Sequence, residues 1–275
     1  MQLNPSLPPS ALNVRVIQNS AGKDIGHNLQ KLDKLLENST ALDLIALPEV
    51  FAFRGCDDDY RQNAELIDGS VFQHLSRLSR QYHAWILAGS IIEKSGTQIF
   101  NTSLLLNRSG DCVAIYRKIH LFEAYLEDGQ VIREQNIYHA GDKPVIASID
   151  GWRCGIAICY DLRFPEFFRY YAGEGAHLFL VPSNFTQRTG KDHWETLLRA
   201  RAIENQVFVV APNQCGANPC SKIVSYGHSL VIGPWGEILC SAGDEECALD
   251  ITLDPASLDS TRRRIPVLTH RRLPI

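Results

Sequence analysis

The chain has 275 residues, of which 45% are hydrophobic, and it carries a formal net charge of −4. This length allows a large buried core, and the acidic balance excludes the broad basic surface that binds nucleic acid. No apolar run approaches the roughly 20 residues of a membrane-spanning helix, so we expect no membrane segment.

Residues 1–11 are rich in proline and serine and are expected to form a loose tail. Residues 12–275 contain no low-complexity linker and no clear repeat, and are expected to fold as a single domain. Apolar patterns predict strands at 13–18, 44–48, 85–90, 99–107, 111–117, 145–149, 153–158, 178–182, 207–212, 226–232, 237–240 and 247–253. Helices are predicted at 24–36 (starting at Asp24 or Gly26), 70–82, 164–172 and 194–205, with a short helix after the last strand.

Three of the predicted strand pairs are hairpins with short turns, and they interrupt the alternation of strands and helices. A simple doubly wound parallel sheet is therefore disfavoured. Mixed sheets packed face to face, with helices outside, fit the pattern better. The expected class is α/β.

The eight cysteines are scattered, with no Cys-x-x-Cys pair and no spacing typical of a zinc site. No signal peptide is recognisable at the N-terminus. The simplest expectation is a reduced, cytoplasmic, metal-free protein without disulfides. Cys154 and Cys247 lie in apolar runs and are expected to be core thiols.

Cys159 lies where the apolar strand 153–158 breaks into a tight turn before the helix 164–172. Pro165 fits the first turn of that helix, where a missing N–H costs nothing. Oriented backbone N–H groups at such a turn favour both a thiolate and an oxyanion. An unpaired cysteine at a strand end is more often a small buried hydrophobe, so Cys159 alone does not decide the chemistry.

Two more polar residues follow apolar strands: Glu49 after 44–48 and Lys118 after 111–117. Functional side chains gather beyond the carboxyl ends of strands, so we expect both to converge with Cys159. The glutamate then takes the thiol proton and passes it to a leaving amine. The lysine supplies a counter-charge and donates to a tetrahedral oxyanion, and the thiolate attacks a carbonyl carbon to give an acyl-enzyme.

Each residue also has an ordinary structural explanation, Glu49 as a solvated loop residue and Lys118 as a surface charge. Ser183 and Ser229 lack the Gly-x-Ser-x-Gly elbow of serine hydrolases. A cysteine–histidine pair at Cys159 stays open, although no papain-like signature surrounds it. Its candidate partners are His120, His139, His193 and His228.

With these residues in place, the chain resembles the nitrilase superfamily of carbon–nitrogen hydrolases over nearly its whole length. Five motifs in order carry the resemblance: Leu47-Pro-Glu49, Tyr116-Arg-Lys-Ile-His-Leu121, Cys159-Tyr-Asp-Leu-Arg-Phe-Pro-Glu166, His193-Trp-Glu-Thr-Leu-Leu-Arg-Ala-Arg-Ala202 and Tyr226-Gly-His-Ser229. The resemblance implies a four-layer α-β-β-α sandwich and no cofactor. It also implies a homodimer, often formed through helices near the nucleophile and through the C-terminal segment.

The resemblance implies that Glu49, Lys118 and Cys159 are the Glu-Lys-Cys triad of this superfamily. The family often carries a second glutamate some way beyond the lysine, and spacing favours Glu134 for that place. Two other glutamates remain as alternatives. They are Glu123 and Glu127.

The chain looks closest to the branch containing deaminated-glutathione amidase and omega-amidase, whose substrates carry a 2-oxo acid end. The pocket is therefore expected to hold a carboxylate, and related carbamoylases use an arginine near the place of Arg163. A planar guanidinium suits this task by bidentate contact. The structural alternative is that Arg163 pairs with Asp161 or Glu166.

Three further residues near the nucleophile have expected roles. The backbone N–H of Tyr160 is expected to donate to the oxyanion, and Asn184 is a second candidate for substrate binding. Asp161 is expected to fix the turn after the nucleophile through bonds from its side chain to the backbone. His193 and His228 are expected to make structural hydrogen bonds.

Deaminated glutathione is the favoured substrate because two segments resemble that type of amidase, Asn213-Gln-Cys-Gly216 and Ser225-Tyr-Gly-His-Ser229. Lys118-Ile-His-Leu-Phe122 and Glu237-Ile-Leu-Cys240 look more like an omega-amidase, which acts on 2-oxoglutaramate or 2-oxosuccinamate. True nitrilases usually have a tryptophan directly after the nucleophile, where this chain has Tyr160. A catalytically idle binding protein is disfavoured because the triad is intact.

Overall fold

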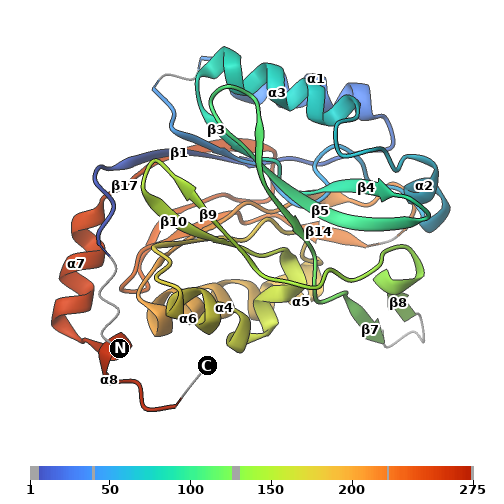
Figure 1. Ribbon diagram of the computed structural model, residues 1–275. Coiled ribbons are helices and arrows are strands. Elements are labelled where there is room, and N and C mark those ends of the chain that lie inside the picture. Colours follow the sequence, from blue (N-terminus) through green and yellow to red (C-terminus); the bar gives the residue numbers. More distant parts are fainter. Residues whose placement is uncertain (1–5, 39–40, 126–130, 222, 274–275) are drawn as a thin grey trace.

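The computed structural model describes residues 6–38, 41–125, 131–221 and 223–273. Two mixed β-sheets lie face to face, and helices cover the outer face of each sheet (Figure 1). This arrangement is the four-layer α-β-β-α sandwich expected from the sequence.

The first sheet has seven strands in the order β17-β1-β2-β3-β5-β4, with β6 paired to β5. Strands β1, β2 and β3 run parallel, whereas β17 and the strands after β3 are antiparallel to their neighbours. The strands are β1 (Leu12–Gln18), β2 (Leu44–Ala46), β3 (Trp85–Leu87), β4 (Ile91–Ser95), β5 (Gln98–Leu106), β6 (Cys112–Arg117) and β17 (Cys247–Leu253).

The second sheet has six strands in the order β16-β15-β12-β11-β10-β9, with β10, β11 and β12 parallel. Its strands are β9 (Val145–Ile149), β10 (Trp152–Ile156), β11 (Leu178–Leu180), β12 (Phe208–Ala211), β15 (Leu230–Ile232) and β16 (Ile238–Ser241). Two small hairpins lie outside both sheets. They are β7 (Glu123–Tyr125) with β8 (Val131–Arg133), and β13 (Cys215–Ala217) with β14 (Val224–Tyr226).

Helices α1 (Ile25–Leu36) and α3 (Ser70–Tyr82) cover the first sheet, and α4 (Pro165–Gly173) and α6 (Glu195–Asn205) cover the second (Figure 1). Helices α7 (Pro255–Arg264) and α8 (Val267–His270) follow β17. The shorter helical segments are α2 (Asp57–Gln62), α5 (Gln187–Thr189), 3₁₀ turns at Glu134–Asn136 and Cys159–Arg163, and a π turn at Gly190–Trp194.

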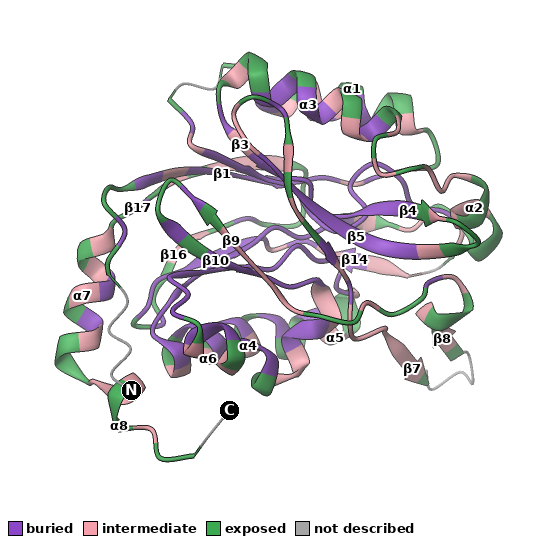
Figure 2. Ribbon diagram, viewed as in Figure 1, coloured by how far each residue is buried: buried purple, intermediate pink, exposed green. Residues whose placement is uncertain are grey.

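The alternation of side chains along the strands decides how the layers pack. In β2, Leu44 and Ala46 join the core between the two sheets. Ile45, and Leu47 directly after the strand, join the core beneath α1 and α3. Successive residues of a strand point to opposite faces, so a run that is apolar throughout must be covered on both sides. Figure 2 shows the resulting buried strands between helices whose outer surfaces are exposed.

Gly89 packs against the backbone of Leu47 and Pro48, which follow β2. Its φ is 52°, and a Cβ there would overlap the carbonyl oxygens of Leu47 and Pro48. Glycine is therefore required for the close approach that directs the chain into Glu49.

The predicted helix 70–82 is confirmed, as are the hairpins at 99–117 and 145–158. The strand predicted at 226–232 is wrong in its first half, because residues up to Tyr226 pair with β13 and β15 begins at Leu230. Gly227 and His228 both have positive φ, at 69° and 54°, and break the run between the two strands. The hairpin β7–β8 and helix α2 were not predicted.

The expectation that all cysteines are reduced is wrong for one pair, because Cys56 and Cys220 form a disulfide. They lie 164 residues apart, and the pairing arises from tertiary packing that local spacing does not reveal. Cys154 is buried as expected, whereas Cys247 is only half-buried.

Part of the predicted tail lies against the second sheet. Pro8 is buried, and the Ser10 carbonyl accepts a 3.0 Å hydrogen bond from the indole of Trp152. Residues 1–5 lie outside the described part. Within the described chain, no helix has both the length and the apolar character needed to cross a membrane.

Gly89→Ala is expected to lower the free energy of unfolding by about 3 kcal/mol or more, since a left-handed conformation and a backbone clash add together. Gly96→Ala is the matched control, because Gly96 has a similar φ of 61° but no atom within 4 Å of a Cβ. Its expected loss is about 1 kcal/mol. Equal losses for the two variants in urea unfolding would contradict this reasoning.

Candidate active site

A pocket of about 540 Å³ opens beyond the carboxyl ends of the central strands, and Glu49, Glu134 and Cys159 all line it. Glu49 follows β2, Lys118 follows β6, and Cys159 follows β10. The three predicted strand-end residues therefore come from two different sheets to one place.

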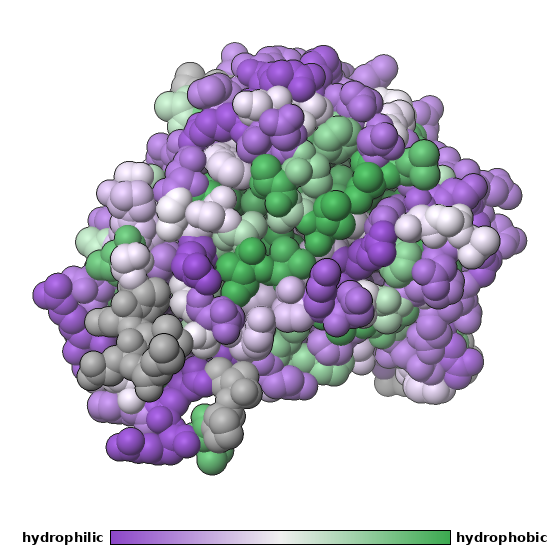
Figure 3. All heavy atoms as spheres, viewed as in Figure 1, coloured by the Kyte–Doolittle hydropathy of each residue, from purple (hydrophilic) through white to green (hydrophobic). Residues whose placement is uncertain are grey.

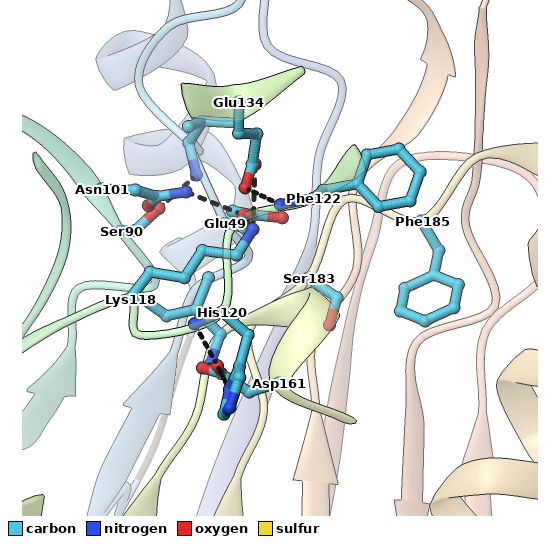
Figure 4. Close-up of polar contacts among 12 residues, drawn as sticks. Glu49, Ser90, Asn101, Lys118, His120, Phe122, Glu134, Asp161, Ser183 and Phe185 are labelled. Atoms are coloured by element: carbon cyan, nitrogen blue, oxygen red, sulfur yellow. Dashed lines mark hydrogen bonds and ion pairs between the residues drawn. The ribbon is translucent and has the colours of Figure 1, made fainter. Parts of the chain in front are cut away.

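Lys118 is the centre of a buried ionic cluster beside this pocket (Figure 4). Its Nζ donates to Glu49 Oε1 at 2.8 Å and to Glu134 Oε1 at 2.9 Å, and its side chain is 1% exposed. Glu134 Oε2 accepts a 2.8 Å bond from the backbone N–H of Phe122, which fixes the carboxylate. The lysine is thus held in a single position between two carboxylates.

Burial and charge oppose each other in this cluster. Burial lowers the pKa of the Lys118 amine, but the charges of Glu134 and Glu49 prevail and raise it well above its ordinary value. Burial also raises the pKa of the Glu134 carboxyl, against the opposing effect of Lys118. The lysine is therefore a fixed cation, able to donate to developing negative charge and unable to act as a base at neutral pH.

Cys159 occupies a strained backbone position at the start of the 3₁₀ turn Cys159–Arg163. Its φ is 48°, and its N–H donates to the carbonyl of Pro182 at 2.9 Å. Val50, next to Glu49, also has a positive φ of 48°. Such conformations are unfavourable for non-glycine residues and persist where surrounding contacts hold them, often at functional sites.

The Cys159 thiol lies in an environment that keeps it protonated. Burial raises its pKa most, the charge of Glu49 raises it further, and Lys118 opposes both. The backbone N–H of Asn184 also lowers the pKa by hydrogen bonding to the sulfur. Among the charged groups, Glu49 makes the largest contribution to this shift.

Asp161 fixes the turn after Cys159, as expected, and also reaches the other sheet. Its Oδ2 accepts from the N–H of Ile158 at 2.8 Å and from the Tyr116 hydroxyl at 2.6 Å. Its Oδ1 binds the N–H and the ring of His120, at 3.1 and 2.7 Å. This one carboxylate joins the segment of the cysteine to the segment that carries Lys118.

Arg163, Tyr160 and Asn184, which are expected to contact the substrate, all line the pocket. Both Nη atoms of Arg163 lie 3.4 Å from Nδ1 of His193, and the guanidinium lies 5.5 Å from the ring centre of Phe185. Among the described residues it pairs with neither Asp161 nor Glu166. Its charge thus has no carboxylate partner in the part of the chain that the structure describes.

Asn184 has its side-chain oxygen occupied, because Oδ1 accepts a 2.6 Å bond from the Ser225 hydroxyl. The hydroxyl of Ser225 accepts in turn from Nη1 of buried Arg54 at 2.6 Å. The group of Asn184 that faces the thiol is its backbone N–H.

The alternative catalytic arrangements are not formed in the described chain. Three of the four candidate histidines hydrogen-bond elsewhere: His120 to Asp161, His193 to Arg163 and His228 to the Tyr226 carbonyl. The ring of the fourth, His139, packs against Phe100, with ring centres 5.9 Å apart. Ser183 donates to the Val181 carbonyl and Ser229 to Gln18, which are structural roles.

Two of the three candidates for the second glutamate, Glu134 and Glu123, lie in the described part of the chain, whereas Glu127 lies outside it. Glu134 contacts Lys118 directly. Glu123 instead accepts hydrogen bonds from Tyr125, Arg133 and Gln135. These bonds, of which that from Tyr125 has the largest effect, lower the pKa of Glu123 to about 2.

Sequence reasoning missed Asn101, whose Nδ2 donates to Glu49 Oε1 at 2.8 Å. Asn101 lies in the middle of β5, away from any strand end, so no pattern marked it. It also missed Tyr60 and Tyr138, which line the pocket wall. The pKa of Tyr60 is raised to about 12, and burial is the largest cause of this shift.

The model of the carbon-nitrogen hydrolase family matches residues 13–263. The chain belongs to this family. It is 35% identical over 262 residues to a deaminated glutathione amidase from Synechocystis sp., covering 93% of this chain and 96% of that protein. It is 33% identical to the chloroplastic omega-amidase of Arabidopsis thaliana, covering 98% and 74% of the two chains.

The solved structure of Saccharomyces cerevisiae Nit3, a member of branch 10 of the nitrilase superfamily, superposes with a TM-score of 0.88. The two chains are 30% identical, and the match covers 98% of this chain and 99% of the other. The chain is thus an amidase of the nitrilase superfamily, a hydrolase of carbon–nitrogen amide bonds in small molecules.

Glu49→Gln is expected to lower the pKa of the Cys159 thiol, because it removes a negative charge that disfavours the thiolate and leaves Lys118 in place. Thiolate absorbance during a pH titration measures this shift, with Cys159→Ala to identify the signal. An unchanged or higher pKa in Glu49→Gln would contradict the electrostatic account.

Proposed function

We propose that Cys159 is the nucleophile of an amidase whose triad also contains Glu49 and Lys118. The observation that carries this proposal is the buried Lys118, held between Glu49 and Glu134 beside a strained cysteine in a single pocket. A buried cation with two carboxylates is costly to assemble for stability alone, and such clusters gather at functional sites.

The proposed reaction begins when Glu49 takes the thiol proton and Cys159 Sγ attacks the amide carbon. Lys118 Nζ and the backbone N–H of Tyr160 donate to the oxyanion of the tetrahedral intermediate. Glu49 returns the proton to the leaving amine, and a thioester remains on Cys159. Water, deprotonated by Glu49, then hydrolyses the thioester and restores the thiol.

Glu134 is proposed to orient the lysine. With its Oε2 held by the N–H of Phe122, its Oε1 fixes the ammonium so that the one proton not given to Glu49 or Glu134 points into the pocket.

The proposed substrate is a small amide with a 2-oxo acid end, and deaminated glutathione is the favoured candidate. Arg163 supports this choice because its guanidinium lies in the pocket wall and has no carboxylate partner among the described residues. A substrate carboxylate would suit it as a partner. Relatives named for deaminated glutathione and for omega-amidase activity both fit this substrate class.

Side-by-side hydrolysis of deaminated glutathione and 2-oxoglutaramate tests the proposal. We expect the higher kcat/KM for deaminated glutathione, followed as 2-oxoglutarate and Cys-Gly because this cleavage releases no ammonia. A preference for 2-oxoglutaramate would make the chain an omega-amidase instead. Cys159→Ala is expected to abolish both reactions, and full activity in that variant would overturn the mechanism.

Arg163→Met belongs in the same assay and is expected to raise KM about tenfold or more, the usual effect of losing one hydrogen-bonded charge. Arg133→Met is its matched control, since Arg133 also lines the pocket but is paired with Glu123 at 2.8 Å. Similar effects from both variants would remove Arg163 from its assigned role.

We also propose a homodimer formed through the face of α4 and α6. Tyr170 on α4 and Ile203 on α6 are exposed on these helices, with Trp235 and Ile265 also exposed nearby in the C-terminal half. Figure 3 shows a second apolar band on the face where β5, β6 and β9 lie, to which β6 contributes exposed Val113 and Ile115.

Light scattering is expected to give about twice the 30.8 kDa of one chain. Ile203→Glu is expected to yield monomer, because it places a charge in the proposed contact. Val113→Glu, the control on the strand face, is expected to remain a dimer. The reverse result would move the interface to that face.

A further inference from the structure

The disulfide Cys56–Cys220 has no part in the chemistry described above, yet both of its cysteines line the active-site pocket. The two Cα atoms are 5.4 Å apart. Cys56 is exposed to solvent and Cys220 is half-buried, so the bond is open to small reagents from outside. Exposed disulfides are typically the ones that exchange with thiols.

The disulfide joins two parts of the pocket lining that lie far apart in the sequence. Cys56 is the N-cap of α2, and the segment around it contributes Gly55, Asp57 and Tyr60 to the lining. Cys220 lies in the turn of the hairpin β13–β14. This hairpin contributes Asn218, Cys220, Ser221, Ile223 and Ser225 to the lining.

The base of that hairpin is anchored independently of the disulfide. Arg54, fully buried, donates to the Ser225 hydroxyl at 2.6 Å and to the Cys215 carbonyl at 3.0 Å. Among the described residues, the hydrogen bonds of Cys220 at the tip are from its N–H to Asn218 Oδ1 at 2.8 Å and from its Sγ to Asp59 Oδ2 at 3.5 Å. The hairpin therefore has an anchored base and a tip that the disulfide attaches to the segment of Cys56.

Charged groups around the bond favour Cys56 as the thiolate that leaves when a small thiol attacks Cys220. Lys23 Nζ lies 3.9 Å from Cys56 Sγ, and a neighbouring ammonium stabilises a thiolate. Lys23 also pairs with Asp59 at 2.7 Å, and Asp59 Oδ2 lies 3.5 Å from Cys220 Sγ. A negative neighbour disfavours a thiolate at Cys220, so the two sulfurs are electrostatically different.

We propose that Cys56–Cys220 is a thiol-exchange site that sets the size of the leaving group the pocket admits. When the disulfide is formed, the hairpin tip is fixed at the rim, so that a small leaving group such as ammonia is admitted and a dipeptide is admitted less readily than in the reduced protein. When the disulfide is reduced, the tip moves about its anchored base and a dipeptide leaving group is accommodated. The choice of these two leaving groups rests on the proposed function.

The exchange needs two equivalents of a small thiol and no other reactant. The first thiolate attacks Cys220 Sγ and forms a mixed disulfide there, while the bond to Cys56 breaks and Cys56 leaves as a thiolate beside Lys23. The second thiolate attacks the outer sulfur of the mixed disulfide and releases Cys220, which takes up a proton. The small thiol is oxidised to its disulfide, and the protein gains two thiols.

Thiol titration of the unfolded protein first establishes the state of the pair. The oxidised protein is expected to show six thiols, and the protein treated with dithiothreitol eight, matching the six free cysteines and the eight in the sequence. Eight thiols after isolation without reductant, or a zinc ion bound to Cys56, Asp59 and Cys220, would overturn the proposal. Those three side chains lie close enough to hold a metal once the bond is absent.

The ratio of kcat/KM for deaminated glutathione to that for 2-oxoglutaramate is the main measurement. We expect reduction to raise this ratio roughly tenfold, the usual effect of one poorly fitting group in a pocket. The ratio does not depend on how much Cys159 is active, because both substrates use the same active fraction. An unchanged ratio after complete reduction would overturn the proposal.

The double variant Cys56→Ser/Cys220→Ser is expected to keep the high ratio with or without dithiothreitol. Cys247→Ser is the matched control, a free, half-buried cysteine outside the pocket lining, and is expected to respond as the unaltered protein does. A redox response that persists in the double variant would contradict the assignment. The titration of the unaltered protein remains decisive if the double variant fails to fold.

Alkylation of Cys159 separates this proposal from the substrate assignment. Reduction is expected to speed labelling by a bulky maleimide more than labelling by iodoacetamide, whatever the natural substrate is. Should neither amide be hydrolysed, the substrate assignment fails while this comparison still tests the rim. Equal acceleration of both reagents would overturn the proposal.

Discussion

The buried ammonium of Lys118 is the constraint to which the rest of the site is fitted. A lysine without solvent is stable only beside negative charge, and here one carboxylate is buried and the other half-buried, with side chains 4% and 19% exposed. Burial first, and then the charge of Glu49, raises the pKa of the neighbouring Cys159 thiol. In the proposed mechanism, reactivity therefore depends on a bound substrate that receives the developing charge.

The positions of these charges are fixed by backbone more than by side-chain packing. Cys159 and Val50 both adopt a left-handed conformation a few residues beyond the ends of buried strands. The Ser90 hydroxyl accepts from the N–H of Val50 at 2.9 Å, Gln214 donates to the carbonyl of Glu49 at 3.0 Å, and the Pro182 carbonyl accepts from the N–H of Cys159 at 2.9 Å. The strained turns are thus supported by hydrogen bonds from three separate parts of the chain.

Glu49, Lys118 and Cys159 could be predicted from sequence because each follows an apolar run that can only be a covered strand. Spacing after the lysine was enough to favour Glu134. Asn101 could not be found in this way, because it lies within β5 and its role depends on the register of three strands.

The pairing of Cys56 with Cys220 was beyond sequence reasoning for a related reason. It requires the hairpin β13–β14, whose second strand merges in sequence with the apolar run of β15. Only the positive φ values at Gly227 and His228 separate them, and backbone angles of that kind leave no clear signal in hydrophobic patterns.

Asp161 gives the site one more property. Its carboxylate lies beside Cys159, the proposed nucleophile, which the second sheet carries, yet it also binds Tyr116 and His120, which flank Lys118 in the segment after the first sheet. The proposed catalytic centre is therefore an interface between two half-molecules rather than a feature of either one. A small sliding of one sheet over the other would separate the Cys159 thiol from the Lys118 ammonium while every helix stayed intact, so on this proposal loss of activity on heating reports the alignment of the sheets.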